Sequence, residues 1–398
     1  MGSYALVQVN DGKVSSIQTK DVYTSDAQLT KWIPAPAGID LVADRLYMRD
    51  ANTSPDFPTS ANQIIDLLDY SRGPSVDTVI AVDQTVTETL LRHTGPIKIP
   101  RTPFTITAEN FNDIMSFYIE SKQPYTTTPK QILIDFIPLF EQRVRSIDNK
   151  LALAPDLLAL IQAGHIQMYS TYESVQTVLE EWGLAGRMIQ AEPDMDFLAM
   201  ISTSVSGNKS DAFIKTDLNH ETELQPSGVF TDKLTITKTH EWSEAAFTPW
   251  KKWADRLGTG ELDLNTLKFI HGAGDNRDFL RIYVPKGSVL LAADGIEMAE
   301  VKTAEALNYT VFEWLYQVKA GSQKSVTLTY QLPFESDNQR YRFLAYHQAG
   351  AENIHLTKTL KIPDALRITK TYPEVDLSKG LQINLNRHAF AVAEWMNE

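Results

Sequence analysis

The sequence has 398 residues, of which 43% are hydrophobic and 22% charged, and its formal net charge at pH 7 is −13. This composition is typical of a globular protein, and the length exceeds what one hydrophobic core usually supports, so we expect two domains. This net negative charge repels the phosphate backbone of nucleic acids and argues against a nucleic-acid partner. It is compatible with a pocket that is locally basic.

The sequence contains no cysteine, which removes disulfides, thiol catalysis and cysteine-based zinc sites. No apolar run approaches the length of a transmembrane helix, and the opening residues MGSYALVQV lack the charged region of a signal peptide. They have the alternation of a strand instead. We expect the natural chain to begin upstream, because a strand that starts at residue 4 has no lead-in.

The first hundred residues predict alternating strands and helices. An Asn-Asp-Gly turn at 10–12 lies between two alternating runs, which indicates a β-hairpin. Helical spacing begins at Pro58 and recurs over 84–93. Between these helices, residues 76–83 (VDTVIAVD) are nearly continuously apolar, as expected for a strand covered on both faces. This rhythm predicts an α/β layer.

Further helices are expected up to residue 192, with one strand, IQMYS, among them. The helices are predicted at 107–122, 129–148, 155–163 and 171–182. Residues 1–192 are therefore assigned to an α/β domain in which helices flank a mixed sheet.

The pattern changes at about residue 193, where alternating runs separated by Gly, Pro, Asn and Asp begin. In two of these runs, Leu234 and Ile236, and later Val326 and Leu328, alternate with Thr, Ser or Lys. One face of each such strand should be buried. We assign residues 193–398 to an antiparallel β-sandwich-like domain with a helical insertion near 249–257.

The polar loop at 49–56 is the densest candidate binding site. Asp50, Asn52 and Asp56 offer hard oxygen ligands for Mg²⁺ or Ca²⁺, and the two aspartates are the candidate metal ligands. Arg49 could clamp a phosphate or carboxylate. The alternative is a structural turn, in which Asp and Asn cap backbone groups and Arg49 pairs with a carboxylate.

Asp83, at the end of the apolar strand, could face a ligand cleft or could cap the following helix. His220-Glu221 and His240-Glu241 fall in predicted strands, where we expect solvated faces. No serine-hydrolase elbow, P-loop or complete dinucleotide-binding fingerprint occurs, so no catalytic residue is assigned.

The order of several short motifs resembles the DUF4012 family of bacterial proteins of unknown function, over nearly the whole chain. The motifs are RDANTSPDFPTSA (49–61), VDTVIAVD (76–83), GPIKIP (95–100), TAEN (107–110), GLAGR (183–187), GNKSDAF (207–213), RIYVPKGSVLL (281–291) and TLTYQLP (327–333). Family members usually begin with a membrane-spanning helix and carry an E-x-R-x-T-G-G-F motif, and this chain starts at the end of that motif. The resemblance implies an extracellular protein tethered to the bacterial membrane through an anchor absent from this chain.

The first half also resembles, more distantly, the LytR-CpsA-Psr phosphotransferases, which attach polyprenyl-phosphate-linked glycopolymers to the cell wall. In that family arginines and aspartates hold a pyrophosphate and Mg²⁺. The resemblance would make Arg49, Asp50 and Asp56 the local candidates for this role, in a domain truncated at its N-terminus.

Two functions remain open. The first is a cell-surface protein that binds an envelope glycan or lipid-linked glycan, or has a structural role there. The alternative is a phosphotransferase-like enzyme that uses Mg²⁺. An Arg49 that lines an apolar groove would favour the enzyme, whereas an Arg49 paired with a structural carboxylate would favour the first function. The ligand and the oligomeric state are not predicted.

Overall fold

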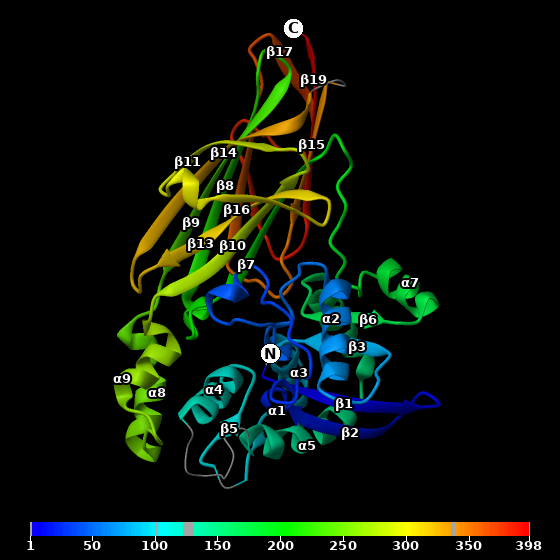
Figure 1. The fold of residues 1–398 in the computed structure, drawn as a ribbon, viewed down its shortest axis with the longest axis vertical. Helices are drawn as coiled ribbons and strands as arrows, with labels where there is room; N and C mark the ends of the chain where they lie inside the picture. The colour runs from blue at the N-terminus through cyan, green and yellow to red at the C-terminus, as the bar shows by residue number, and fades with distance from the viewer. Residues whose placement is uncertain (1, 101, 122–130, 336–338, 398) are drawn as a thin grey trace. The chain divides into compact units, whose positions relative to one another are not determined.

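The computed structural model of the protein describes residues 2–100, 102–121, 131–335 and 339–397 (Figure 1). Contacts within the chain define two units: unit 1 comprises 1–82 and 166–189, and unit 2 comprises 83–165 and 190–398. The last passage between the units, at 189/190, lies close to the predicted boundary at 192/193. Residues 83–165, which we predicted in the first domain, group with unit 2 instead.

Unit 1 combines short helices with two-stranded sheets. The hairpin turn lies where the sequence predicts it, with φ values of 50° at Asp11 and 74° at Gly12. The elements are β1 (Ser3–Asn10), β2 (Lys13–Asp21), α1 (Val22–Asp26), the 3-10 helices Ile39–Leu41 and Met48–Asp50, α2 (Phe57–Tyr70), β3 (Thr78–Val82), β6 (Ile166–Ser170) and α7 (Glu173–Glu181). The expected mixture of helices and strands is therefore confirmed.

The strand at 76–83 differs from the prediction in its surroundings. It forms β3, which pairs antiparallel with β6 alone, and Ile80 and Val82 are 56% and 59% exposed. The described strands of residues 1–192 form three two-stranded sheets, β1 with β2, β3 with β6 and β4 with β5, instead of the single mixed sheet that we predicted. A run of apolar residues indicates a strand, but it does not say which faces other elements cover.

Unit 2 begins with helices that share an aromatic core. Phe117 and Trp250 meet edge to face, with ring centroids 5.5 Å apart, so α4 packs against α8. The elements are α3 (Gln84–Thr94), β4 (Ile97–Lys98), β5 (Thr105–Ile106), α4 (Phe111–Ser121), α5 (Gln131–Arg145), the 3-10 helix Lys150–Leu153, α6 (Ala154–Gln162), α8 (Glu244–Leu257), α9 (Leu264–Lys268) and the π-helix Phe269–Ala273.

The helix predicted near 249–257 is α8. The helix predicted at 129–148 begins outside the described residues, and its described part is α5. None of the helices in the described ranges combines the length and the apolar character that a membrane span requires.

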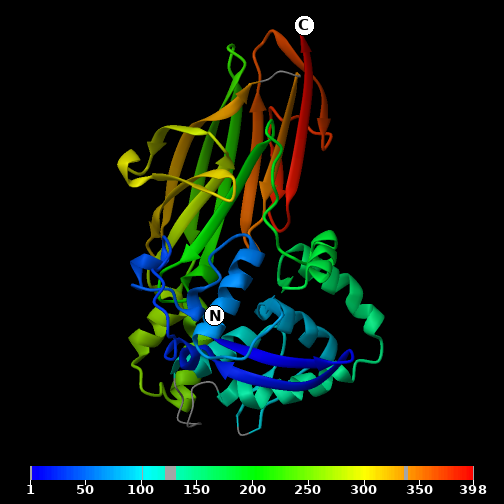
Figure 2. The same cartoon turned by 45° about the vertical axis from the view of Figure 1, so that its right-hand side comes forward.

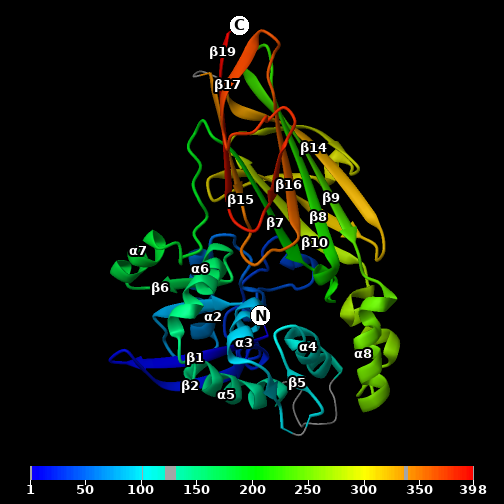
Figure 3. The same cartoon turned by 180° about the vertical axis from the view of Figure 1, so that it is seen from behind.

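The rest of unit 2 is a sandwich of two sheets (Figures 1 and 2). The seven-stranded sheet has the order β12-β13-β10-β7-β15-β19-β17, and the six-stranded sheet β11-β14-β9-β8-β16-β18. Two pairs, β7 with β15 and β8 with β16, are parallel, so the sheets are mixed and not purely antiparallel as predicted (Figure 3).

The bounds of the sandwich strands follow from the same structure. They are β7 (Asp196–Ser204), β8 (Ile214–Leu224), β9 (Val229–His240), β10 (Asn276–Pro285), β11 (Val289–Asp294), β12 (Lys302–Ala306), β13 (Tyr309–Val318), β14 (Gln323–Glu335), β15 (Arg340–Tyr346), β16 (Ile354–Lys361), β17 (Leu366–Tyr372), β18 (Leu381–Asn384) and β19 (Ala389–Asn397). Two short 3-10 helices, Ser210–Phe213 and Met298–Glu300, lie between strands.

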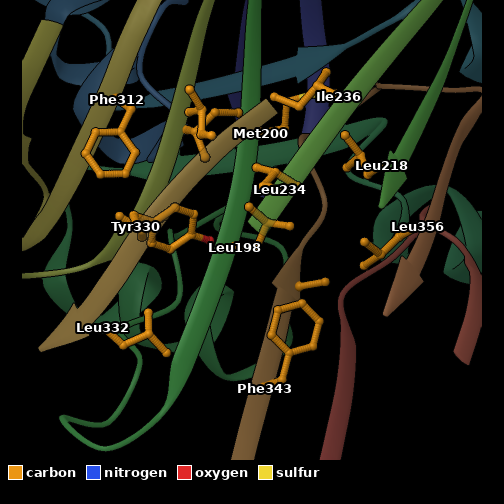
Figure 4. Packing of buried hydrophobic residues seen from close by; sticks show 14 of the residues in the cluster. Leu198, Met200, Leu218, Leu234, Ile236, Phe312, Tyr330, Leu332, Phe343 and Leu356 are labelled. Carbon is orange, nitrogen blue, oxygen red and sulfur yellow. The ribbon is translucent and has the colours of Figure 1, made fainter. Parts of the chain in front are cut away.

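The core of the sandwich is built from the alternation that the sequence predicts. Leu234 on β9 lies opposite Leu328 on β14, and Ile236 lies opposite Val326; all four are fully buried. They meet side chains of the other sheet, such as Leu198 and Phe343 (Figure 4). The hydrophobic face shared by the two sheets therefore holds this part of the chain together.

Replacing Leu234 by Ala should lower the free energy of unfolding by about 2–5 kcal/mol, because the change removes buried methyl groups and leaves a cavity. Urea unfolding measures this loss. The neighbouring Lys233 is exposed on the other face of β9, and Lys233→Ala should change stability by less than about 0.5 kcal/mol. Equal losses in the two variants would contradict the assignment of the buried face.

Candidate functional site

Arg49 pairs with a structural carboxylate. Its Nη1 lies 2.9 Å from Oδ2 of Asp26, whose side chain is only 3% exposed and also accepts the Met48 amide at 2.7 Å. The guanidinium of Arg49 lies over the Tyr47 ring, 3.9 Å from its centroid. These contacts match the structural alternative for this loop.

Asp56 likewise has local partners. It caps α2 by accepting the Thr59 amide, and its Oδ1 accepts the Met188 amide at 3.1 Å. Gly186, in the GLAGR turn, accepts the Phe57 amide at 3.0 Å and has a φ of 58°, where a Cβ would lie 2.1 Å from the Gln167 amide nitrogen. The GLAGR turn is therefore hydrogen-bonded to the start of α2.

The remaining predicted residues of the loop are less enclosed. Asn52 is exposed, and burial raises the pKa of Asp50 while Arg49 beside it opposes that shift.

Among the described residues, only Asp196, His220 and Asp232 form a group of three potential metal ligands within 4.8 Å of one another. Asp50 and Asp56 are not in such a group, and their role as metal ligands stays a prediction.

Asp83 caps the following helix and also contacts a histidine that lines a cleft. Its Oδ1 accepts the Thr85 amide at 2.9 Å and caps α3, and its Oδ2 lies 2.6 Å from Nδ1 of His165. This hydrogen bond raises the pKa of His165, while partial burial opposes the shift. His165 in turn lines a cleft.

The cleft lies within unit 2 and has a volume of about 750 Å³. Its walls come from α3, from α6 and the residues after it, from the segment between β15 and β16, from the start of β16, and from the end of β18 and the segment after it. The polar residues that line it are Thr85, Thr89, Arg92, Asp156, Gln162, His165, His347, Glu352, Asn353, His355, Asn384, Asn386 and Arg387. Sequence analysis missed this site because its walls come from separate segments.

The chemistry of the cleft is that of hydrogen bonding. Arg92 and Arg387 are exposed and supply donors, Asp156 and Glu352 supply acceptors, and the three asparagines supply both. Burial lowers the pKa of His347, which keeps that imidazole neutral at pH 7.

A second group of polar side chains lies inside the sandwich. Asp196, His220, Asp232 and Lys358, which we call the charged cluster, are all 0% exposed. The expectation of a solvated face is therefore wrong for His220, and also for His240, which is 1% exposed. The signal was present in the sequence, because Asp232 and Lys358 fall on the apolar side of their alternating strands.

The Asp83–His165 pair generates a test of the cleft. Asp83→Asn keeps the helix cap but removes the charge, so the pKa of His165 should fall, as followed by NMR titration of its ring protons. Because the pKa of His165 is higher in the folded than in the unfolded protein, its protonation stabilises the fold at pH values below the unfolded pKa of 6.5. This stabilisation is lost as the pH rises through the folded pKa.

The stability lost in Asp83→Asn should therefore be greatest below pH 6.5 and shrink at higher pH. It should be at most about 1 kcal/mol, because the Asp83 side chain is 38% exposed and water screens the pair. Asp255→Asn, on an exposed part of α8, is the control and should show no such pH dependence. A loss that is constant with pH would contradict the pairing.

Comparisons with known proteins give distant structural matches. One is a putative nutrient binding protein from Legionella pneumophila, with 7% identity and a TM-score of 0.25 over 51% of this chain and 67% of that one. Another is an M1 zinc metallopeptidase from Deinococcus radiodurans bound to a Tyr-Ser-Ala substrate, with 9% identity and a TM-score of 0.22 over 45% and 42%. No curated protein matches by sequence.

At these TM-scores the matches do not indicate a function. Neither of them is a LytR-CpsA-Psr phosphotransferase, so the resemblance to that family gains no support. The sequence itself gives one family match. Residues 1–118 match the family described as a protein of unknown function, DUF4012, in agreement with the motifs of that part of the chain.

Proposed function

We propose that the protein is a binding protein of the bacterial cell envelope, held outside the membrane by an anchor, and that the cleft of unit 2 takes a polar, hydroxyl-rich ligand such as an envelope glycan. The observation that carries this proposal is the cleft itself. Its lining combines amides, carboxylates and guanidiniums within about 750 Å³.

A glycan fits this lining for a chemical reason. Each sugar hydroxyl both donates and accepts hydrogen bonds, and asparagine amides do the same, whereas arginine only donates and carboxylates only accept. The volume lies in the range of about 300–1,000 Å³ that small-molecule sites occupy. The presence of both cations and acids favours a neutral or zwitterionic ligand over a strongly anionic one.

The phosphotransferase alternative has less support. It requires Arg49, Asp50 and Asp56 to hold a pyrophosphate and Mg²⁺, but Arg49 lies against Asp26 and Asp56 accepts two backbone amides. Breaking the Arg49–Asp26 pair would leave a carboxylate that is 3% exposed without its cation. We therefore place the ligand in the cleft and assign no enzymatic activity.

The test is isothermal titration of the protein with soluble fragments of purified bacterial cell-wall glycan. Arg92→Gln and Arg387→Gln should each weaken binding by about tenfold or more, because a hydrogen bond to a charged group contributes about 1.5–3 kcal/mol. Both arginines are exposed, so the variants should remain folded.

Arg256→Gln is the matched control, since Arg256 is an exposed arginine of α8 that does not line the cleft. It should bind as the wild type does. An absence of heat with all envelope glycans, or equal affinities for the wild type and both cleft variants, would contradict the proposal.

A further inference from the structure

The charged cluster joins the two sheets of the sandwich. Lys358 on β16, His220 on β8 and Asp232 on β9 belong to the six-stranded sheet, whereas Asp196 on β7 belongs to the seven-stranded sheet. Each of these side chains is 0% exposed. A lysine and an aspartate from opposite sheets thus meet in an interior that water does not reach.

The lysine amine is held close to the aspartate. Nζ of Lys358 lies 3.5 Å from Oδ2 of Asp196, 3.1 Å from Nδ1 of His220 and 2.5 Å from Oγ1 of Thr222. The Tyr341 hydroxyl donates to Oδ2 of Asp196. Thr222 donates in turn to Oδ1 of Asp232, so a chain of hydrogen bonds runs from the amine to a second carboxyl group.

Burying these side chains in their charged forms would cost free energy. Each buried ion loses several kcal/mol of hydration, and two carboxylates face one ammonium here. Oδ1 of Asp196 makes no hydrogen bond within the described structure, and Oδ2 of Asp232 lies 3.2 Å from Nε2 of His220. Buried charges in this situation tend to neutralise one another by proton transfer, which would leave an amine beside a carboxylic acid.

The protonation states follow the same physics. Burial lowers the pKa of Lys358, and it raises the pKa of Asp196 to about 6, with the neighbouring Asp232 adding to that shift. Burial also raises the pKa of Asp232 and lowers that of His220 to about 3. A neutral amine is a nucleophile and a protonated carboxyl group is its electrophile.

We infer that Lys358 and Asp196 form an intramolecular amide bond that links the two sheets covalently. The lone pair of Nζ attacks Cγ of Asp196 and forms the C–N bond, while the C=O π pair moves onto Oδ2, where Tyr341 stabilises the oxyanion. When that pair returns, the bond between Cγ and Oδ1 breaks. Oδ1 leaves as water, carrying its own hydrogen and one proton from Asp232.

Asp232 and Thr222 move the proton that balances the reaction. Nζ gives up one proton through Oγ1 of Thr222 to Asp232, which passes it to the departing Oδ1. Asp232 ends as it began, and the net change is the loss of one water molecule. The product removes a buried ion pair and exposes no new charge, in a protein without cysteines to cross-link its sheets otherwise.

A second buried pair provides a comparison. Lys238 on β9 contacts Asp278 on β10 and also joins the two sheets, with each residue 2% exposed. The acid near it, Asp211, accepts a hydrogen bond from Asn276 at 2.7 Å, and no hydrogen bond of the described structure connects it to Lys238. A divalent cation on Asp196, His220 and Asp232 is a further alternative, but it would have to displace the Lys358 amine from its contact with His220.

Intact-mass spectrometry of the purified wild type tests the inference. The protein should be lighter than its sequence by one water molecule. Trypsin should then release residues 188–209 joined to 343–361, with Lys358 uncleaved. Lys358→Arg and Asp196→Ala should each restore the full mass, and the control Lys238→Arg should keep the loss.

Asp232→Asn should slow formation of the bond by about a hundredfold, seen as full-mass protein that loses water on incubation. A wild-type mass equal to that of the sequence, a mass increased by a metal ion, or a loss abolished by Lys238→Arg alone would each overturn the inference. If the cluster variants do not fold, the wild-type mass and its joined peptides decide the question without them.

Discussion

The pairing of Lys358 with Asp196 is the constraint that fixes how the two sheets of the sandwich face each other. A lysine and two carboxyl groups lie where the hydrophobic faces of two sheets meet, and none of them is accessible to solvent. Slipping one strand by one residue would turn its charged group outward and leave the others without a partner. The cluster thus fixes which residues of β7, β8, β9 and β16 face one another.

The same strand connects this cluster to the cleft. Ile354 and His355, at the start of β16, line the cleft, and Lys358 follows on the same strand. Before β16, the side chain of Gln348 bonds both the amide and the carbonyl of Ser202 on β7, which fixes the connecting segment. Rigid strands that position polar groups at their ends are the usual support for a binding site.

Local features of this chain were predictable from the sequence, because they depend on neighbouring residues. The hairpin at Asp11 and Gly12, the cap by Asp83 and the alternation around Leu234 are of this kind. The grouping of 83–165 with the sandwich was not predictable, since its partners lie far along the chain. The cleft and the charged cluster were missed for the same reason, although inward-facing Asp232 and Lys358 offered a hint.

The most direct measurement is the distance between Nζ of Lys358 and Cγ of Asp196 in a high-resolution crystal structure. A covalent amide predicts continuous electron density and a separation of about 1.3 Å, the length of a C–N amide bond. A separation above about 3 Å, with two distinct side chains in van der Waals contact, would contradict it. Lys358 and Asp196 would then be joined by an ion pair alone.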